Sequence, residues 1–167
     1  ELHLGKGVVA FENNDERIDV VLSSQKRIAA DIVILSIGVR PTTTLARDAK
    51  IALGEVGGIR VDSFMQTSAE GIYAVGDAVE FEHPLLNKPW LNLLAGPANR
   101  QARIAADNMV FGNTLAYEGS IGTSIAKVFD MTVASTGLPA KRLKQMEIPY
   151  LSATIHSGSH AGYYPGA

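Results

Sequence analysis

Two short apolar runs, each ending at a glycine, constrain the fold of this chain more than any other feature. Residues 32–38 read IVILSIG and residues 72–76 read IYAVG, and neither run alternates between apolar and polar side chains. A strand of this kind is buried on both faces, as in a parallel sheet that is covered by helices. We therefore expect an α/β fold in which one buried strand ends at Gly38 and another ends at the pair Gly76–Asp77.

The elements around these runs are predicted from turn and capping signals. Residues 8–11 and 18–22 favour the two strands of a hairpin, with the turn at residues 13–15. Thr43 or Thr44 can cap a short helix, and residues 58–62 predict a short strand. A longer helix begins at Pro97 and ends at Gly112, which is a typical C-terminal cap. Its buried face is expected to carry the small or apolar residues at helical spacing: Ala98, Ala102, Ala105 and Met109.

The pattern changes near Tyr117, from parallel α/β before it to α+β after it. Residues 124–136 predict two strands that meet near Asp130, and Pro139 begins a short helix. Residues 150–157 then predict another strand. A domain boundary is therefore expected near residue 117.

Composition and charge exclude several classes of protein. The chain has no cysteine, so disulfides, thiolate metal sites and a nucleophilic thiol are excluded within it. The net charge of −2 gives no attraction to nucleic acid or to a membrane surface. No apolar run approaches the roughly 18 residues of a membrane span, and no signal peptide is visible. We expect a cytoplasmic protein whose two ends here are cuts through a longer chain.

The carboxylate of Asp77 is the leading candidate for ligand binding. Ligands of open parallel sheets bind beyond the carboxyl ends of the strands, where a carboxylate can accept hydrogen bonds from sugar-type hydroxyl groups. The helix start at Pro97 favours a negatively charged group through its free N–H groups and its dipole. A flavin nucleotide offers both a polyol chain and a ring that becomes anionic on reduction. An ordinary turn is the alternative interpretation of the Gly–Asp pair.

Several segments resemble the pyridine nucleotide–disulfide oxidoreductases, in the order in which that family has them. TSAEGIYAVGDAVE (67–80) resembles the family's second FAD-binding motif, and LLAGPANRQARIAADN (93–108) resembles the segment that follows it in the branch with a single active-site cysteine. ADIVILSIGVRPTTTLA (30–46) resembles the end of the NAD-binding domain. GSIGTSIAKVFDMTVASTG (119–137) and HAGYYPGA (160–167) resemble the start of the dimerisation domain. Coenzyme A-disulfide and persulfide reductases are the most similar subgroup.

The resemblance implies a division of the chain into three parts. Residues 1–45 would end the NAD(P)-binding domain, residues 46–116 would form the second segment of the FAD-binding domain, and residues 117–167 would begin the dimerisation domain. The fold would thus combine pieces of Rossmann-like domains with the start of an α+β domain. The parent protein would be a homodimer.

The resemblance also implies roles for individual residues. Asp77 would bind a ribityl hydroxyl of FAD, and Gly76 would make the turn. Leu94, Ala95 and Gly96 would lie along the flavin ring. Gly38 would contact NAD(P)H at the domain junction. Tyr163 or Tyr164 would belong to the region that reaches toward the thiol-substrate site of the partner subunit.

The family's catalytic cysteine and both of its glycine-rich phosphate loops are absent from these residues. The parent enzyme would pass electrons from NAD(P)H through FAD to a cysteine and its small-molecule disulfide or persulfide substrate. We expect this chain alone to be catalytically silent and to bind FAD weakly or not at all. The alternatives are an NADH oxidase or peroxidase, a ferredoxin-type reductase, and a non-enzymatic module that self-associates.

Three further clusters are interpreted as structural. His156 and His160 have the spacing of helical zinc ligands, but the glycine and serines between them disfavour a helix, so no metal site is expected. Glu80 and Glu82 are interpreted as solvated charges, and the basic stretch 141–144 as a solvated helix face.

Overall fold

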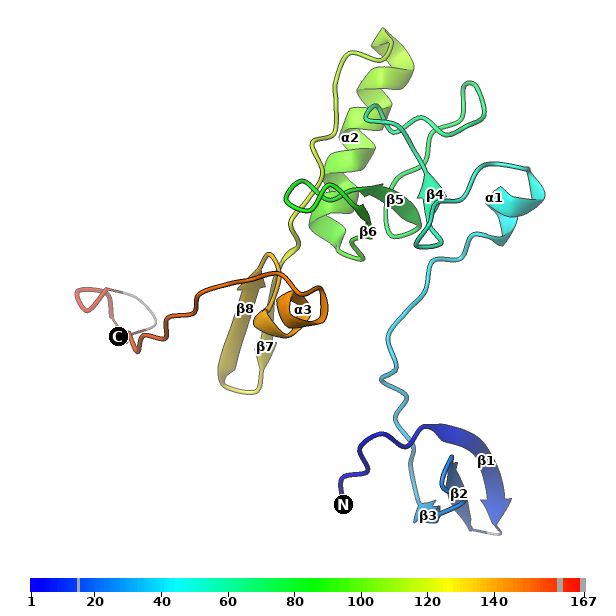
Figure 1. The fold of residues 1–167 in the computed structure, drawn as a ribbon, viewed down its shortest axis with the longest axis vertical. Helices are drawn as coiled ribbons and strands as arrows, with labels where there is room; N and C mark the ends of the chain where they lie inside the picture. Colours follow the sequence, from blue (N-terminus) through cyan, green and yellow to red (C-terminus); the bar gives the residue numbers. More distant parts are fainter. Residues whose placement is uncertain (15, 159–160, 166–167) are drawn as a thin grey trace. The chain divides into compact units, whose positions relative to one another are not determined.

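The computed structural model describes residues 1–14, 16–158 and 161–165. The chain divides into two compact units, Glu1–Val39 and Arg40–Ala167, and each is described by itself (Figure 1). No helix in the described ranges is both long enough and apolar enough to cross a membrane.

The first unit is a three-stranded antiparallel sheet in the order β1-β2-β3. The strands are β1 (Val8–Asn14), β2 (Arg17–Leu22) and β3 (Arg27–Ala30). The predicted hairpin is therefore confirmed, with Asn14 opposite Arg17 at its end. Val21 and Leu22, at the end of β2, are the buried residues of this sheet.

Residues 32–38 do not form the buried strand that their apolar sequence predicts. They are extended and form no helix or strand, and the side chains of Ile34 and Ile37 are 86% and 87% exposed. A strand that is apolar on both faces needs neighbouring strands and covering helices. None of the strands in the described part of the chain pairs with this segment, so the prediction is wrong for this chain.

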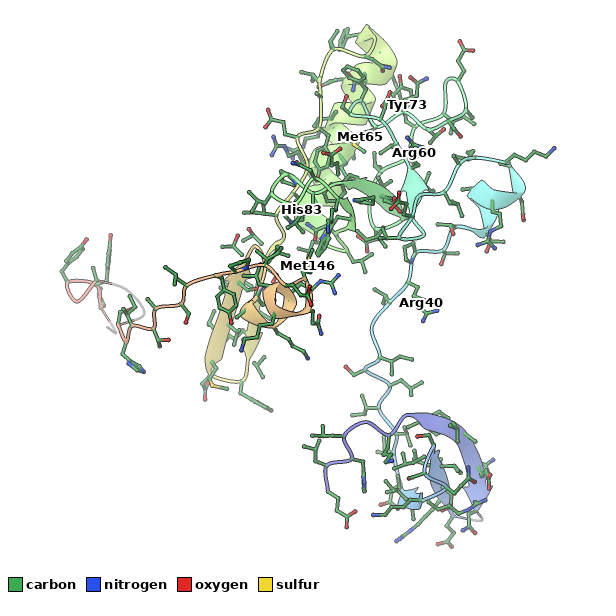
Figure 2. All side chains as sticks on the ribbon, viewed as in Figure 1. Arg40, Arg60, Met65, Tyr73, His83 and Met146 are labelled. Atoms are coloured by element: carbon green, nitrogen blue, oxygen red, sulfur yellow. The ribbon has the colours of Figure 1, made fainter. Side chains whose placement is uncertain are left out.

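The second unit is built around a small mixed sheet and one long helix. After α1 (Thr44–Asp48), the strands are β4 (Ile59–Arg60), β5 (Val79–Glu82) and β6 (Pro89–Leu91). The strand order is β4-β5-β6, with β4 parallel and β6 antiparallel to β5. The helix α2 (Ala95–Phe111) lies beside β5 and β6 (Figure 1). The shared core consists of Met65, Val79, Phe81, Ile104, Ala105 and Tyr117, and Figure 2 labels Met65, which is fully buried.

The strand predicted at residues 72–75 lies instead on the other side of the Gly–Asp pair. Tyr73 makes only an isolated bridge to Gln66, and Ile72 and Val75 are 45% and 38% exposed. The regular strand β5 begins at Val79, because the parallel partner β4 pairs there. The Gly76–Asp77 pair thus enters the buried strand rather than ending it.

Helix α2 is confirmed, but its buried face differs from the predicted one. It ends at Gly112, whose φ of +84° suits glycine. The buried residues are Gln101, Ile104, Ala105 and Asn108, whereas Met109 is 58% exposed. The face was mispredicted because two of its members are amides, which are buried to bond the loops on either side.

The remaining elements follow residue 117. The strands β7 (Thr123–Val128) and β8 (Met131–Thr136) form the predicted hairpin. Helix α3 (Ala140–Gln145) begins after Pro139, as expected. Residues 150–157 form no strand, and Leu151 and Ile155 are exposed, because no described strand pairs with them.

Candidate functional site

The Gly76–Asp77 turn is attached to the N-terminal half of α2. The backbone N–H of Gly76 donates to Oε1 of Gln101 at 2.8 Å, and the Gln101 side chain is buried. A Cβ atom on Gly76 would stand 3.9 Å from the Cβ of Ala98, and the φ of Gly76 is +89°. This backbone conformation favours glycine. The turn is therefore anchored to α2 at Gln101, about two helical turns beyond the start of the helix.

The start of α2 leaves hydrogen-bond donors available beside this turn. Leu94 is the extended N-cap residue, and the first helical bond runs from the N–H of Ala98 to the carbonyl of Leu94 at 3.2 Å. The N–H groups of Ala95 and Gly96 therefore have no partner within the helix, and both residues are exposed. Asp77 is also exposed. One carboxylate and two free N–H groups thus lie near the same helix end.

The other residues that were assigned binding roles lie elsewhere in the chain. Gly38 belongs to the first unit and has a φ of +81°. The rings of Tyr163 and Tyr164 pack on each other at 4.7 Å between centroids. The roles of these three residues remain predictions. His160 lies outside the described residues, and the described ones contain no group of three or more His, Cys, Asp or Glu side chains that could hold a metal ion.

Glu80 was expected to be solvated, and the structure shows that this is wrong. Its side chain is buried, and its carboxylate accepts the N–H groups of Glu55 at 2.9 Å and Val56 at 2.8 Å. Glu82, two residues later, is exposed as expected. Alternation does not separate the two positions, because residues two apart on a strand face the same way. Glu80 is buried because the loop at residues 54–58 covers it, whereas Glu82 is the last residue of β5.

His83 is a second buried polar residue that sequence reasoning did not identify (Figure 2). Its Nδ1 accepts the N–H of Leu85 at 3.2 Å, while Nε2 has no hydrogen-bond partner among the described residues. The ring packs edge-on against Trp90 at 5.0 Å, and Arg142 of α3 lies over Trp90 at 5.4 Å. Burial lowers the pKa of His83 and raises that of Tyr117. The neutral imidazole therefore acts as a packing element.

A parallel pair of strands with a long helix packed beside it, and a Gly–Asp turn held against that helix, place the second unit in the α/β class. Residues 1–106 match the pyridine nucleotide-disulphide oxidoreductase family, and the chain belongs to this family. The family predicted from the sequence motifs is therefore confirmed.

Named relatives of this chain reduce sulfur compounds. It is 32% identical over 165 residues to the NAD(P)H sulfur oxidoreductase (CoA-dependent) of Pyrococcus abyssi, which covers 99% of this chain and 36% of the relative. It is 33% identical over 136 residues to the coenzyme A disulfide reductase of Staphylococcus haemolyticus, which covers 81% of this chain and 30% of the relative. The chain thus spans about a third of the length of these relatives.

A solved structure supports the fold. The reduced Bacillus anthracis CoADR-RHD superimposes with a TM-score of 0.83 and 45% sequence identity, over 96% of this chain and 28% of that chain. The Rossmann-like α/β class and the oxidoreductase family are supported together by these matches.

Proposed function

We propose that this chain forms the part of a flavoprotein reductase that holds the ribityl chain and the ring of FAD. The parent protein passes electrons from NAD(P)H through FAD to a cysteine-linked disulfide or persulfide, such as coenzyme A disulfide. The observation that carries the proposal is the 2.8 Å hydrogen bond from Gly76 to Gln101, which holds the Asp77 turn against the N-terminal half of α2.

The residues present are suited to FAD. The exposed carboxylate of Asp77 can accept hydrogen bonds from ribityl hydroxyls, and the free N–H groups of Ala95 and Gly96 can donate to the pyrimidine edge of the ring. Leu94, at the N-cap, offers an apolar contact beside them. FAD supplies the redox chemistry, by accepting a hydride from the nicotinamide and passing electrons on to sulfur.

The rest of the assignment concerns the other residues of this chain and the remainder of the parent protein. Because the chain has no cysteine, the redox-active thiol must come from elsewhere in the parent protein, and we propose that the chain alone is catalytically silent. The three-part division at residues 45 and 116, the contact of Gly38 with NAD(P)H, the substrate contacts of Tyr163 and Tyr164, and a homodimeric parent belong to the same proposal.

The test uses the full-length parent protein and measures bound flavin. Asp77→Ala should lower the FAD retained per polypeptide and weaken rebinding of FAD to the apoprotein by about ten- to hundredfold, since hydrogen bonds to a charged group contribute about 1.5–3 kcal/mol. Asp107→Asn, on the exposed side of the same helix, should bind FAD like the wild type. Equal FAD affinity in Asp77→Ala and wild type would contradict the assignment of Asp77.

The acceptor is tested on the same preparation. Oxidation of NAD(P)H should be fast with coenzyme A disulfide or a coenzyme A persulfide, and slow with oxygen or peroxide alone. The reverse order would favour the oxidase or peroxidase alternative. A parent protein without flavin would refute the whole proposal.

A further inference from the structure

The buried carboxylate of Glu80 closes the loop formed by residues 54–58. Besides the N–H groups of Glu55 and Val56, Oε2 of Glu80 lies 3.4 Å from the N–H of Gly58. None of the ion pairs between described residues includes Glu80. The negative charge is therefore compensated by backbone N–H groups, which bind an anion strongly when several converge on it.

The glycines of this loop make room for the carboxylate. A Cβ atom on Gly54 would overlap the carboxylate of Glu80, and one on Gly58 would stand 2.8 Å from the backbone nitrogen of Glu80. The loop is closed on itself by a bond from the N–H of Gly54 to the carbonyl of Gly58 at 2.8 Å. Both positions therefore need glycine while Glu80 occupies this place.

The loop is connected directly to the Asp77 turn through β4 and β5. The two strands pair only at Ile59↔Val79 and Arg60↔Glu80, which is a short ladder. Immediately before it, the N–H of Ile59 donates to the carbonyl of Ala78 at 2.7 Å, and the N–H of Val79 donates to the carbonyl of Gly76 at 3.1 Å. Glu80 therefore fixes residues 54–59 to the strand that continues from the turn.

We propose that Glu80 is a positioning residue, whose bonds to the 54–58 loop hold the Gly76–Asp77 turn in the geometry that binds FAD. This inference rests on the proposed function. Glu80 bonds to the amides of the loop, and its effect on the turn passes through the β4–β5 ladder. It therefore contributes to FAD binding without contact with the cofactor.

The experiment compares Glu80→Gln with Glu82→Gln in the full-length protein. The amide of Glu80→Gln keeps the shape of the side chain but turns one acceptor oxygen into a donor that faces N–H groups. FAD should rebind to the folded Glu80→Gln apoprotein about tenfold more weakly than to wild type, as expected for the loss of a charge-assisted bond. The visible circular dichroism of the bound flavin should change as well. Glu82→Gln, whose side chain is exposed on the same strand, should match wild type in both.

These readouts separate positioning from stability alone. A residue that only stabilises the fold would lower the unfolding midpoint of the apoprotein and leave the FAD affinity of the folded fraction unchanged, and that result would overturn the inference. If wild type binds no FAD, the proposed function fails. If wild type binds FAD and Glu80→Gln binds it equally, only the role of Glu80 fails.

A measurement on the wild type decides the matter even where Glu80→Gln does not fold. Coupling between two sites is reciprocal, so FAD must stabilise the closed loop if the closed loop favours FAD. The amides of Glu55 and Val56 should exchange with deuterium several-fold more slowly in the holoprotein than in the apoprotein. Identical exchange of both amides in the two forms would refute the coupling.

Discussion

Replacing Asn108 by alanine should destabilise the second unit more than any other amide substitution on α2. The Asn108 side chain uses its full hydrogen-bonding capacity. Its Nδ2 donates to the carbonyl oxygens of Phe64 at 3.0 Å and Leu115 at 2.8 Å, and its Oδ1 accepts the N–H groups of Thr114 at 3.0 Å and Leu115 at 2.9 Å. The side chain is 1% exposed, so it joins the helix to the segment that turns back beyond Gly112.

The magnitude follows from these four bonds. Each contributes about 0.5–1.5 kcal/mol net. Thr114 and Leu115 are exposed, so water can satisfy part of what Asn108→Ala leaves unpaired, which favours the lower half of that range. The expected loss in the free energy of unfolding is therefore about 2–4 kcal/mol. Asn99→Ala, on the same helix, loses one exposed bond to the carbonyl of Ala95 and should cost less than about 0.5 kcal/mol.

Urea unfolding monitored by tryptophan fluorescence provides the assay. Trp90 is the single tryptophan and lies in the second unit, so its signal reports that unit without contribution from the antiparallel sheet of the first. A loss below about 1 kcal/mol for Asn108→Ala, at an unchanged urea slope, would mean that the four bonds are replaced by water at little cost. The reasoning from buried amides would then be refuted.

Two further predictions concern a glycine and a histidine. Gly119→Ala should lower the free energy of unfolding by about 2 kcal/mol or more, since the new Cβ would lie 2.9 Å from the carbonyl oxygen of Glu82 at a φ of +83°. The control Gly71→Ala, at a φ of +72° with open space around it, should lower it by about 1 kcal/mol. Equal losses in the two variants would refute the steric argument. Burial lowers the pKa of His83, so the unfolded chain binds the proton more tightly. The contribution of His83 to stability should therefore be full above the unfolded-state pKa of about 6.5 and fall as the pH drops through it. Urea midpoints measured between pH 7.5 and 5.5 should show this decline in the wild type and a flatter one in His83→Phe.

The sequence was most informative where structure depends on local signals. The first hairpin, the caps at Gly112 and Pro139, and the strands that meet at Asp130 follow from turn and capping chemistry, and all were found. Residues 32–38 failed because burial of a two-sided apolar strand depends on partners far away in sequence. The strand at 72–75 failed for a related reason, since its pairing is decided by where β4 lies.

The candidate site, too, was predictable only where it depends on local signals. Its position at Gly76–Asp77 and the start of α2 was predictable, because a glycine turn and a helix start have local signatures. The buried amide of Gln101 and the carboxylate of Glu80 were not. Both are polar residues whose burial depends on hydrogen-bond partners 25 residues distant, and no periodicity in the sequence indicates such pairs.

The overlap between Gly54 and the carboxylate of Glu80 has an evolutionary consequence. A larger residue at position 54 is incompatible with glutamate at position 80, because both would occupy the same space. Substitutions at the two positions are therefore epistatic: a side chain can be accepted at 54 only after the acid at 80 has been shortened or lost. A protein engineer who wishes to stiffen this loop by removing its glycines has to begin at the strand.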